Sequence, residues 1–267
     1  MAQPDPTEVM AVVARRGPVL RAVDTEGVPK RDLVDELSVS RSTVDRAVRE
    51  LEAIGFVERT DNGGYRRTLP GRLALTEYDQ FARRIEGLGD SVDVLSLLPA
   101  DAPCDPCVLE DATVVVAERH SPLTPVERLS DLVDRATHVD AIAPAVLPQQ
   151  VEIYHRKFVD DDLSARLVFT NDVIDRLVSS YRTELTESLD TGQLEIRRCE
   201  RSIPYSLVAA ETDAGPEMGF LVYADSGVQG FVGNDSPKAV EWARDLVDDY
   251  WKSGTPFPSP TADGRFQ

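Results

Sequence analysis

Residues 30–68 read KRDLVDELSVSRSTVDRAVRELEAIGFVERTDNGGYRRT, and this stretch decides the fold of the N-terminal part of the chain. Apolar residues at helical spacing predict a short helix, a polar break and a second helix over 41–54. Ser40 lies at the end of the break, where its side chain is placed to cap the second helix. Gly55 is expected to end that helix.

Two short strands and a tight turn follow the second helix. Residues 56–59 and 65–68 alternate like strands around Asp-Asn-Gly-Gly at 61–64, which is a strong signal for a hairpin turn. The order of helix, turn, helix and hairpin predicts a winged helix-turn-helix with a basic wing. The alternative is an ordinary helical hairpin with a solvated arginine face, which the turn chemistry and the order of the elements disfavour.

The second predicted helix carries arginine and short polar side chains outside its apolar stripe. A recognition helix presents such side chains at its N-terminal turns, where they reach base edges in the major groove. Cations on a wing contact the DNA backbone or the adjacent minor groove. We therefore expect this surface to bind double-stranded promoter DNA. The candidate DNA-binding residues are Ser40, Arg41, Ser42, Thr43, Arg46 and Arg49 on the helix, with Arg66 and Arg67 on the wing.

Two parts of the sequence resemble known families. The segment SRSTVDRAVRELEAIGFVER, residues 40–59, resembles the recognition helix and first wing strand of archaeal winged-helix transcription regulators. The later pattern ARLVFTNDVIDRL, GQLEIRRCERSIPYSLVAAE and MGFLVYADSGVQGFVGNDSPKAVEWARDLVDDYW resembles the effector domain of archaeal methanogenesis-regulator-type proteins. It is similar, more distantly, to the sugar-sensing domain of archaeal sugar-operon regulators, which has a phospholipase-D-like fold without activity. The resemblance implies a transcription regulator with a ligand-sensing C-terminal domain.

The length and cysteine content limit the class of protein. A chain of 267 residues accommodates one small and one medium-sized domain. No apolar run approaches the length of a membrane-spanning helix, and the N-terminus MAQPDPTEVM lacks the pattern of a signal peptide. Three cysteines cannot form a disulfide framework, which agrees with a reducing compartment. We therefore expect a soluble, cytoplasmic protein.

The net charge of −18 is unusual for a protein that is expected to bind DNA. Residues 1–75 contain 12 Lys+Arg and 12 Asp+Glu, so the whole acidic excess lies in residues 76–267. Only four of the 29 basic residues are lysines. This composition resembles that of proteins from salt-accumulating halophiles, whose high charge keeps them soluble; an acidic mesophilic protein is the alternative. In molar salt a strongly basic DNA-binding surface would gain little from counterion release.

The segment after the wing predicts a helical connection. Residues 71–98 are expected to be a linker that contains a long amphipathic helix over 71–89. Its apolar surface exceeds what a solvated connector needs, so it either forms a dimer or packs on its own domain. We favour a homodimer, because operators usually match a two-fold protein. A further helix over 7–25, interrupted at 17–18, should pack behind the helix-turn-helix.

Taken together, these patterns predict an α+β protein. A winged helix-turn-helix domain over 1–70 is followed by a mixed α/β effector-sensing domain over 108–253. In the second domain we expect strands at 113–117, 139–143, 166–169, 194–198, 205–210, 218–223 and 228–232, and helices at 125–136, 150–159, 172–189 and 238–251. Residues 254–267 are rich in proline and polar residues and are expected to be disordered.

A regulator of this kind needs a site for a small-molecule effector. Polar residues at strand ends of the predicted α/β domain are the candidates, because loops at strand ends commonly bind ligands. The candidate ligand-binding residues are Thr170, Asn171, Tyr205, Tyr223 and Asn234.

A short motif suggests a different class of function. His155, Lys157 and Asp162 match H-x-K-x4-D, the phospholipase D motif, in which the histidine is nucleophile or acid and the lysine binds phosphate. That superfamily needs two such motifs, and this chain has no second one. Helical periodicity around the motif also argues against the strand that the family uses. A phosphodiesterase tethered to DNA is therefore the alternative, and we expect no catalytic residue.

Cys104 and Cys107 form a C-x-x-C pair near the predicted domain boundary. The third cysteine and the three histidines lack the spacing of a zinc site, so we expect no metal and no cofactor. Inert thiols are the preferred interpretation, and a thiol redox-responsive repressor remains the alternative.

Overall fold

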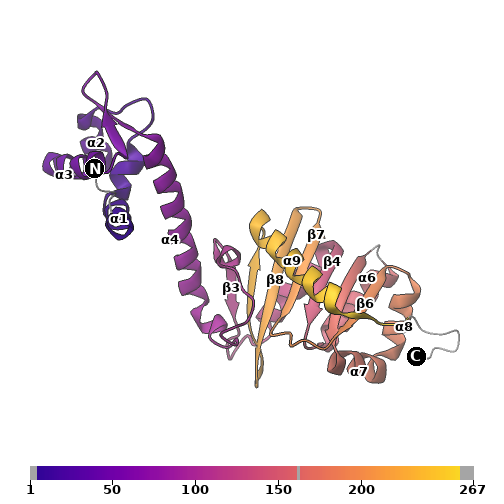
Figure 1. The fold of residues 1–267 in the computed structure, drawn as a ribbon. Helices are drawn as coiled ribbons and strands as arrows, with labels where there is room; N and C mark the ends of the chain where they lie inside the picture. Colours follow the sequence, from indigo (N-terminus) through magenta and orange to yellow (C-terminus); the bar gives the residue numbers. More distant parts are fainter. Residues whose placement is uncertain (1–4, 161–162, 259–267) are drawn as a thin grey trace. The chain divides into compact units, whose positions relative to one another are not determined.

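The computed structural model describes residues 5–160 and 163–258. They divide into two compact units, Met1–Ile85 and Glu86–Gln267 (Figure 1). The helix α4 (Leu69–Leu95) contributes residues to both units. Each unit has its own hydrophobic core and is described separately.

The N-terminal unit is a winged helix-turn-helix, as predicted. Its elements are α1 (Pro6–Ala22), α2 (Lys30–Leu37), α3 (Arg41–Ala53), β1 (Val57–Arg59) and β2 (Tyr65–Arg67). The three helices share a core that includes Leu20, Leu33 and Leu51, all fully buried. The strands β1 and β2 pair antiparallel, with Glu58 opposite Arg66.

Local sequence signals produce the tight turn between α2 and α3. Ser38 adopts the left-handed conformation at φ 52°, which ends α2. Two residues later, the Ser40 hydroxyl accepts a hydrogen bond from the Thr43 amide at 3.2 Å and caps α3. Gly55 follows α3 at φ 77°, a conformation that glycine adopts at little cost.

The predicted interruption of the first helix at 17–18 was wrong. The helix α1 runs through Pro18, which removes one backbone hydrogen bond without ending the helix. Val13, Val19 and Leu20 are buried on either side of this proline in the sequence, while Pro18 itself is exposed. Burial of these apolar side chains outweighs the cost of the lost hydrogen bond.

The C-terminal unit contains an eight-stranded mixed sheet in the order β10-β6-β5-β4-β7-β8-β9-β3. Strand β4 is parallel to β5, and β5 is parallel to β6, whereas β4–β7, β7–β8, β8–β9 and β9–β3 are antiparallel. The strands are β3 (Thr113–Val116), β4 (Ala136–Ala143), β5 (Ser164–Thr170), β6 (Leu194–Cys199), β7 (Ser206–Thr212), β8 (Gly215–Ala224), β9 (Gly227–Asn234) and β10 (Thr255–Pro256).

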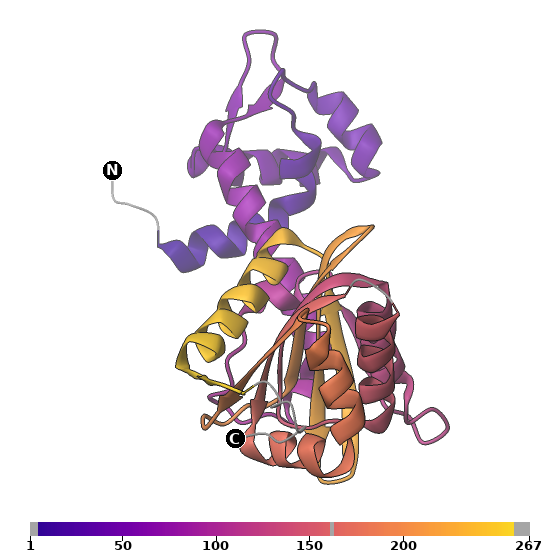
Figure 2. The ribbon, with the colours of Figure 1, turned by 90° about the vertical axis from the view of Figure 1, so that its right-hand side faces the viewer.

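Helices cover both faces of this sheet (Figure 2). One face packs against α9 (Pro237–Ser253), through Val240, Ala243 and Val247. The other face packs against the remaining helices, whose buried residues include Leu129, Phe158 and Ile174. These helices are α5 (Thr124–Arg135), α6 (Pro148–Val159), α7 (Asn171–Ser180) and α8 (Arg182–Asp190). The predicted mixed α/β domain is therefore confirmed.

Two local predictions in this unit were wrong. The helix expected over 172–189 is divided at Tyr181, whose backbone (φ −135°, ψ 36°) is not helical and whose ring packs against the core. The disorder expected from residue 254 is wrong for the first residues of the tail, because Thr255 and Pro256 pair with Arg198 and Arg197 of β6 and Phe257 is buried. Residues 259–267 lie outside the described part of the chain.

An ion-pair network fastens α9 to its face of the sheet. On β5, Arg166 binds both carboxylate oxygens of Asp140 on β4, at 2.7 and 2.9 Å, and also Asp248 on α9, at 3.0 Å. Burial opposes the ionisation of Asp140, but the hydrogen bonds from His138 and Arg166 outweigh it and lower the pKa of Asp140 to about 2. The charged form of Asp140 therefore stabilises the folded state.

We predict that Asp140→Asn lowers the free energy of unfolding of the C-terminal unit by about 2–3 kcal/mol at pH 7, because it leaves a partly buried guanidinium with one carboxylate fewer. Both tryptophans, Trp242 and Trp251, lie in this unit, so urea unfolding followed by tryptophan fluorescence measures it. Asp249→Asn removes the same charge from an exposed position of α9 and should change the free energy by less than about 0.5 kcal/mol.

The effect should also depend on pH. Folding lowers the pKa of Asp140 from its ordinary value of 3.8 to about 2, so its contribution is complete above pH 3.8 and is lost as the pH falls toward 2. The difference between wild type and Asp140→Asn should narrow over this range. A difference that stays constant down to pH 2 would contradict the assigned role of the carboxylate.

Candidate functional site

The helix α3 and its N-cap present the predicted DNA-binding residues to solvent. Ser40, Arg41, Ser42, Thr43, Arg46 and Arg49 are all exposed. The Ser40 hydroxyl lies 2.8 Å from the hydroxyls of both Ser42 and Thr43, so the three hydroxyl groups form one cluster at the start of the helix. The opposite face of α3 carries Val44, Val48 and Leu51 into the core. The expected division of α3 into a core face and a polar face is confirmed.

The two wing arginines differ in their surroundings. Arg66 is exposed and its Nε donates to Glu58 on the neighbouring strand at 2.7 Å. Arg67 is half-buried, and its Nε is buried without a hydrogen-bond partner among the described residues. Of the eight predicted DNA-binding residues, Arg67 alone is therefore turned partly inward.

The basic surface also includes two residues that sequence reasoning missed. Burial, and to a smaller extent the charges of Arg41, Arg49 and Arg59, lower the pKa of Lys30. Lys30 also pairs with Asp45 on α3. Lys30 begins α2 and Arg59 ends β1, so only the fold brings them beside the recognition helix.

Ion pairs hold α3 against α1. Glu50 on α3 binds Arg16 at 2.9 Å and Arg15 at 3.0 Å. The hydrogen bond from Arg16 is the largest of the effects that lower the pKa of Glu50 to about 2. These ion pairs join α3 to α1 through arginines of α1 and use none of the predicted DNA-binding arginines.

The five residues predicted to bind an effector do not form one site. Thr170 ends β5, and the exposed Asn171 starts α7. The Tyr205 hydroxyl donates to the Pro103 carbonyl, and the Asn234 amide donates to the carbonyls of Val108 and Glu110. These two side chains therefore have structural partners.

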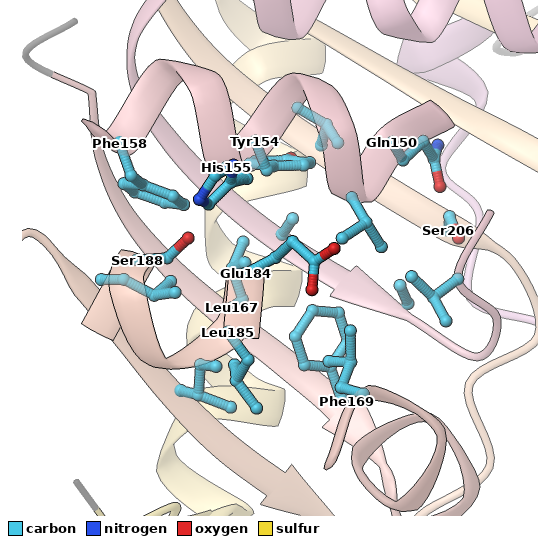
Figure 3. A pocket seen from close by; sticks show the side chains of 18 of the residues that line it. Gln150, Tyr154, His155, Phe158, Leu167, Phe169, Glu184, Leu185, Ser188 and Ser206 are labelled. Atoms are coloured by element: carbon cyan, nitrogen blue, oxygen red, sulfur yellow. The ribbon is translucent and has the colours of Figure 1, made fainter. Parts of the chain in front are cut away.

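An apolar cavity of about 90 Å³ lies between the sheet and the helices α6 and α8 (Figure 3). Its floor includes a row of residues that are paired across four strands: Ile196, Leu167, Ala141 and Val208. Phe169, Ala143 and Ser206 also line it. None of the five predicted effector residues lines the cavity, although the hydroxyl of Tyr223 lies 2.6 Å from that of Ser206. No local sequence pattern marks this cavity, because most of its lining is apolar.

A few polar groups interrupt the apolar wall of the cavity. Gln150, Tyr154 and His155 come from α6, and Glu184 and Ser188 from α8. Burial raises the pKa of Tyr154, whose hydroxyl has no hydrogen-bond partner among the described residues. The His155 Nε2 lies 2.7 Å from a carboxylate oxygen of Glu187. An apolar pocket with a few polar groups is typical of small-molecule sites.

The motif that suggested phosphodiesterase chemistry is on a helix. His155 and Lys157 both lie in α6, as their periodicity predicts. His155 pairs with Glu187, and Lys157 donates to the backbone carbonyl of Asp134 at 2.9 Å. Asp162, the third member of the motif, lies outside the described residues. Lys157 therefore caps a neighbouring helix end in this structure, rather than meeting a second motif.

The cysteines show no arrangement that suggests redox or metal chemistry. All three are free thiols, and Cys107 and Cys199 are buried. Burial of the thiol group, together with the charge of Asp105, raises the pKa of Cys104 to about 11, which disfavours the reactive thiolate. Within 5–160 and 163–258, no group of three or more His, Cys, Asp and Glu residues could hold a metal ion. Nor does any helix in these ranges combine the length and apolar character needed to span a bilayer.

Solved structures resemble the chain only weakly. TrmBL2, described as an archaeal chromatin protein, is 15% identical over 94% of this chain and 94% of its own, with a TM-score of 0.41. A phospholipase D family member, Nuc from Salmonella typhimurium, is 14% identical over 56% of this chain and 99% of its own, with a TM-score of 0.41. An IclR homolog from Microbacterium sp. strain HM58-2 is 16% identical over 89% of this chain and 94% of its own, with a TM-score of 0.25. Such low scores establish neither fold nor function, and no curated protein matches the chain.

Family models match both parts of the chain. Residues 4–89 match the HVO_A0261 N-terminal domain, which includes the whole winged helix-turn-helix. Residues 122–253 match the middle domain of the methanogenesis regulatory protein FilR1, which includes the strands and helices around the cavity. The chain is thus an archaeal-type transcription regulator that joins an HVO_A0261-type N-terminal domain to a FilR1-type middle domain.

Proposed function

We propose that this regulator binds promoter DNA as a homodimer through α3 and the β1–β2 wing, and that its C-terminal unit senses a small-molecule effector without catalysing a reaction. The observation that carries the proposal is the exposed N-terminal face of α3, where arginines and capping hydroxyls are free to reach base edges. Effector binding would change DNA affinity by favouring one of two conformations.

We predict that Arg41→Ala/Arg46→Ala lowers the affinity for the chain's own upstream DNA at least about 10-fold, since a base-contacting arginine contributes about 1–3 kcal/mol. Fluorescence anisotropy in molar KCl measures this, because non-specific phosphate contacts weaken with salt. The matched variant Arg128→Ala/Arg176→Ala removes two exposed arginines from the other unit and should bind normally. Equal binding by all three proteins would contradict the assignment of α3.

The helix α4 supports the homodimer. Phe81, Ile85, Leu88 and Val92 follow at intervals of four, three and four residues, and each is between 44% and 50% exposed. This is the spacing of a coiled-coil seam, in which such residues pack against a second helix. The occupant that fits a continuous apolar stripe on a helix of this length is the same helix of a second copy.

We predict that Ile85→Lys/Leu88→Lys converts the dimer to a monomer, because two charges in the seam cannot be buried without partners. Sedimentation equilibrium measures the mass directly, and specific DNA affinity should fall with it. Asp90→Lys places a lysine on the side of α4 away from the seam and should leave the dimer intact. A wild-type chain that sediments as a monomer would refute the homodimer.

Adaptation to high salt is the remaining part of the proposal. The acidic excess of the C-terminal unit repels itself in dilute buffer, and the Debye length falls from about 10 Å at 0.1 M salt to about 3 Å at 1 M. We predict that KCl raises the thermal unfolding midpoint at pH 7 and raises it less near the sequence pI of 4.6, where the net charge vanishes. Tryptophan fluorescence during heating tests this, and a midpoint that is independent of salt at pH 7 would contradict it.

A further inference from the structure

The cavity beneath α6 and α8 has an acidic entrance. A second depression adjoins it and shares Val151, His155 and Glu184 with its lining. The carboxylates of Glu152 and Glu187 also line this depression. Neither lining contains a lysine or arginine among the described residues, so His155 is the one basic side chain there. Because His155 is already paired with Glu187, the entrance attracts positive charge.

Glu184 is the carboxylate closest to the cavity and lacks a cation. It is half-buried and forms no ion pair or hydrogen bond with the residues that the structure describes. Figure 3 shows its carboxylate pointing toward the middle of the cavity. Other carboxylates that are partly buried are paired, for example Asp140 with Arg166 and Glu217 with Arg135. An unpaired carboxylate beside an apolar wall gains most from a partner that brings positive charge.

The walls of the cavity also suit a cation with an apolar part. The rings of Tyr154 and Phe158 stack at 6.1 Å between centroids, and both line the cavity together with Phe169. Aromatic faces attract cations, and their apolar area accommodates a hydrocarbon chain. The unpartnered Tyr154 hydroxyl offers one further hydrogen bond to a ligand.

We propose that the cavity binds a small organic cation, a protonated amine whose apolar tail lies along Leu167, Ala141 and Val208 and whose ammonium group pairs with Glu184. This inference rests on the proposed effector-sensing function and specifies the chemical class of the effector. A carboxylate ligand would be repelled by the glutamates at the entrance, and this repulsion grows as the distance between the charges falls. A polyhydroxylated ligand would leave most of its hydroxyl groups facing apolar side chains without hydrogen bonds.

Three six-carbon ligands with the same tail test the head group: hexylammonium, hexan-1-ol and hexanoate. Isothermal titration of the full-length protein at pH 7, without DNA, should rank their affinities in that order. Hexylammonium should bind about 10-fold more tightly than hexanol, the factor that one partly buried charged hydrogen bond supports. Equal or tighter binding of hexanoate, or no binding of any of the three, would overturn the proposal.

The variant Glu184→Gln should reduce hexylammonium affinity to that of hexanol and leave hexanol affinity unchanged, because it removes the charge and keeps the shape. Asp190→Asn removes a charge from an exposed position of the same helix, outside the lining, and should alter neither affinity. If Glu184→Gln bound hexylammonium as tightly as the wild type, Glu184 would not be the partner of the ammonium group.

The DNA-binding experiment separates this inference from the proposed function. Normal DNA binding by a protein that does not prefer hexylammonium would refute only the ligand class. Selective binding of hexylammonium by a protein that does not bind its upstream DNA would refute only the regulator. A change of DNA affinity on addition of hexylammonium, absent in Glu184→Gln, would support both.

Discussion

The parallel pairing of β4, β5 and β6 is the constraint on which the C-terminal unit depends. A strand cannot return parallel to its neighbour through a tight turn, so α6 must connect β4 to β5, and α7 and α8 must connect β5 to β6. Both connections step across the sheet in the same direction. Because such crossovers are right-handed, they place these helices on the same face. The cavity exists because α6 and α8 form a roof over this face of the parallel strands.

The size of the side chains beneath that roof determines that a space remains. Ala141 and Ala143 lie on β4, between the larger Leu167 and Phe169 of β5 and the residues Val208 and Ser206 of β7. Protein interiors rarely leave such gaps unfilled, because lost packing contacts destabilise the fold. The opposite face, by contrast, is closed by α9 and by the paired charges of Arg166, Asp140 and Asp248. One face of the sheet thus carries the ion-paired helix α9, and the other face carries the cavity.

The N-terminal unit exposes a basic face of α3, although the chain as a whole has a large acidic excess. Ser40 caps α3 through its side chain, and Glu50 of α3 pairs with Arg16 of α1. The predicted DNA-binding arginines of α3 take no part in these two contacts. Lys30 and Arg59 lie near these arginines but are paired with Asp45 and Glu52, so the positive charge comes mainly from the exposed arginines, although residues 1–75 have no net charge. Such a local concentration suits DNA recognition in salt that screens long-range attraction.

Local sequence signals determined most of the elements. The Ser40 cap, Gly55 and the Asp-Asn-Gly-Gly turn act within a few residues, so the winged helix could be predicted from the sequence. Periodicity similarly located the strands and helices of the second unit. It failed at Pro18 and Tyr181, where packing against the core outweighs or interrupts the local preference for a helix.

The tertiary structure alone decided which residues meet. Tyr205 and Asn234 looked like ligand contacts because they are polar and near strand ends, but their hydrogen bonds join segments about 100 residues or more distant in sequence. Glu184 and Tyr154 showed no local signal, since each is an ordinary residue of an amphipathic helix until α6 and α8 are brought together over the sheet. Short-range geometry was thus enough to predict the elements and the exposed polar face of α3 from the sequence. The cavity and its acidic entrance depended on long-range strand pairing, which no local pattern encodes.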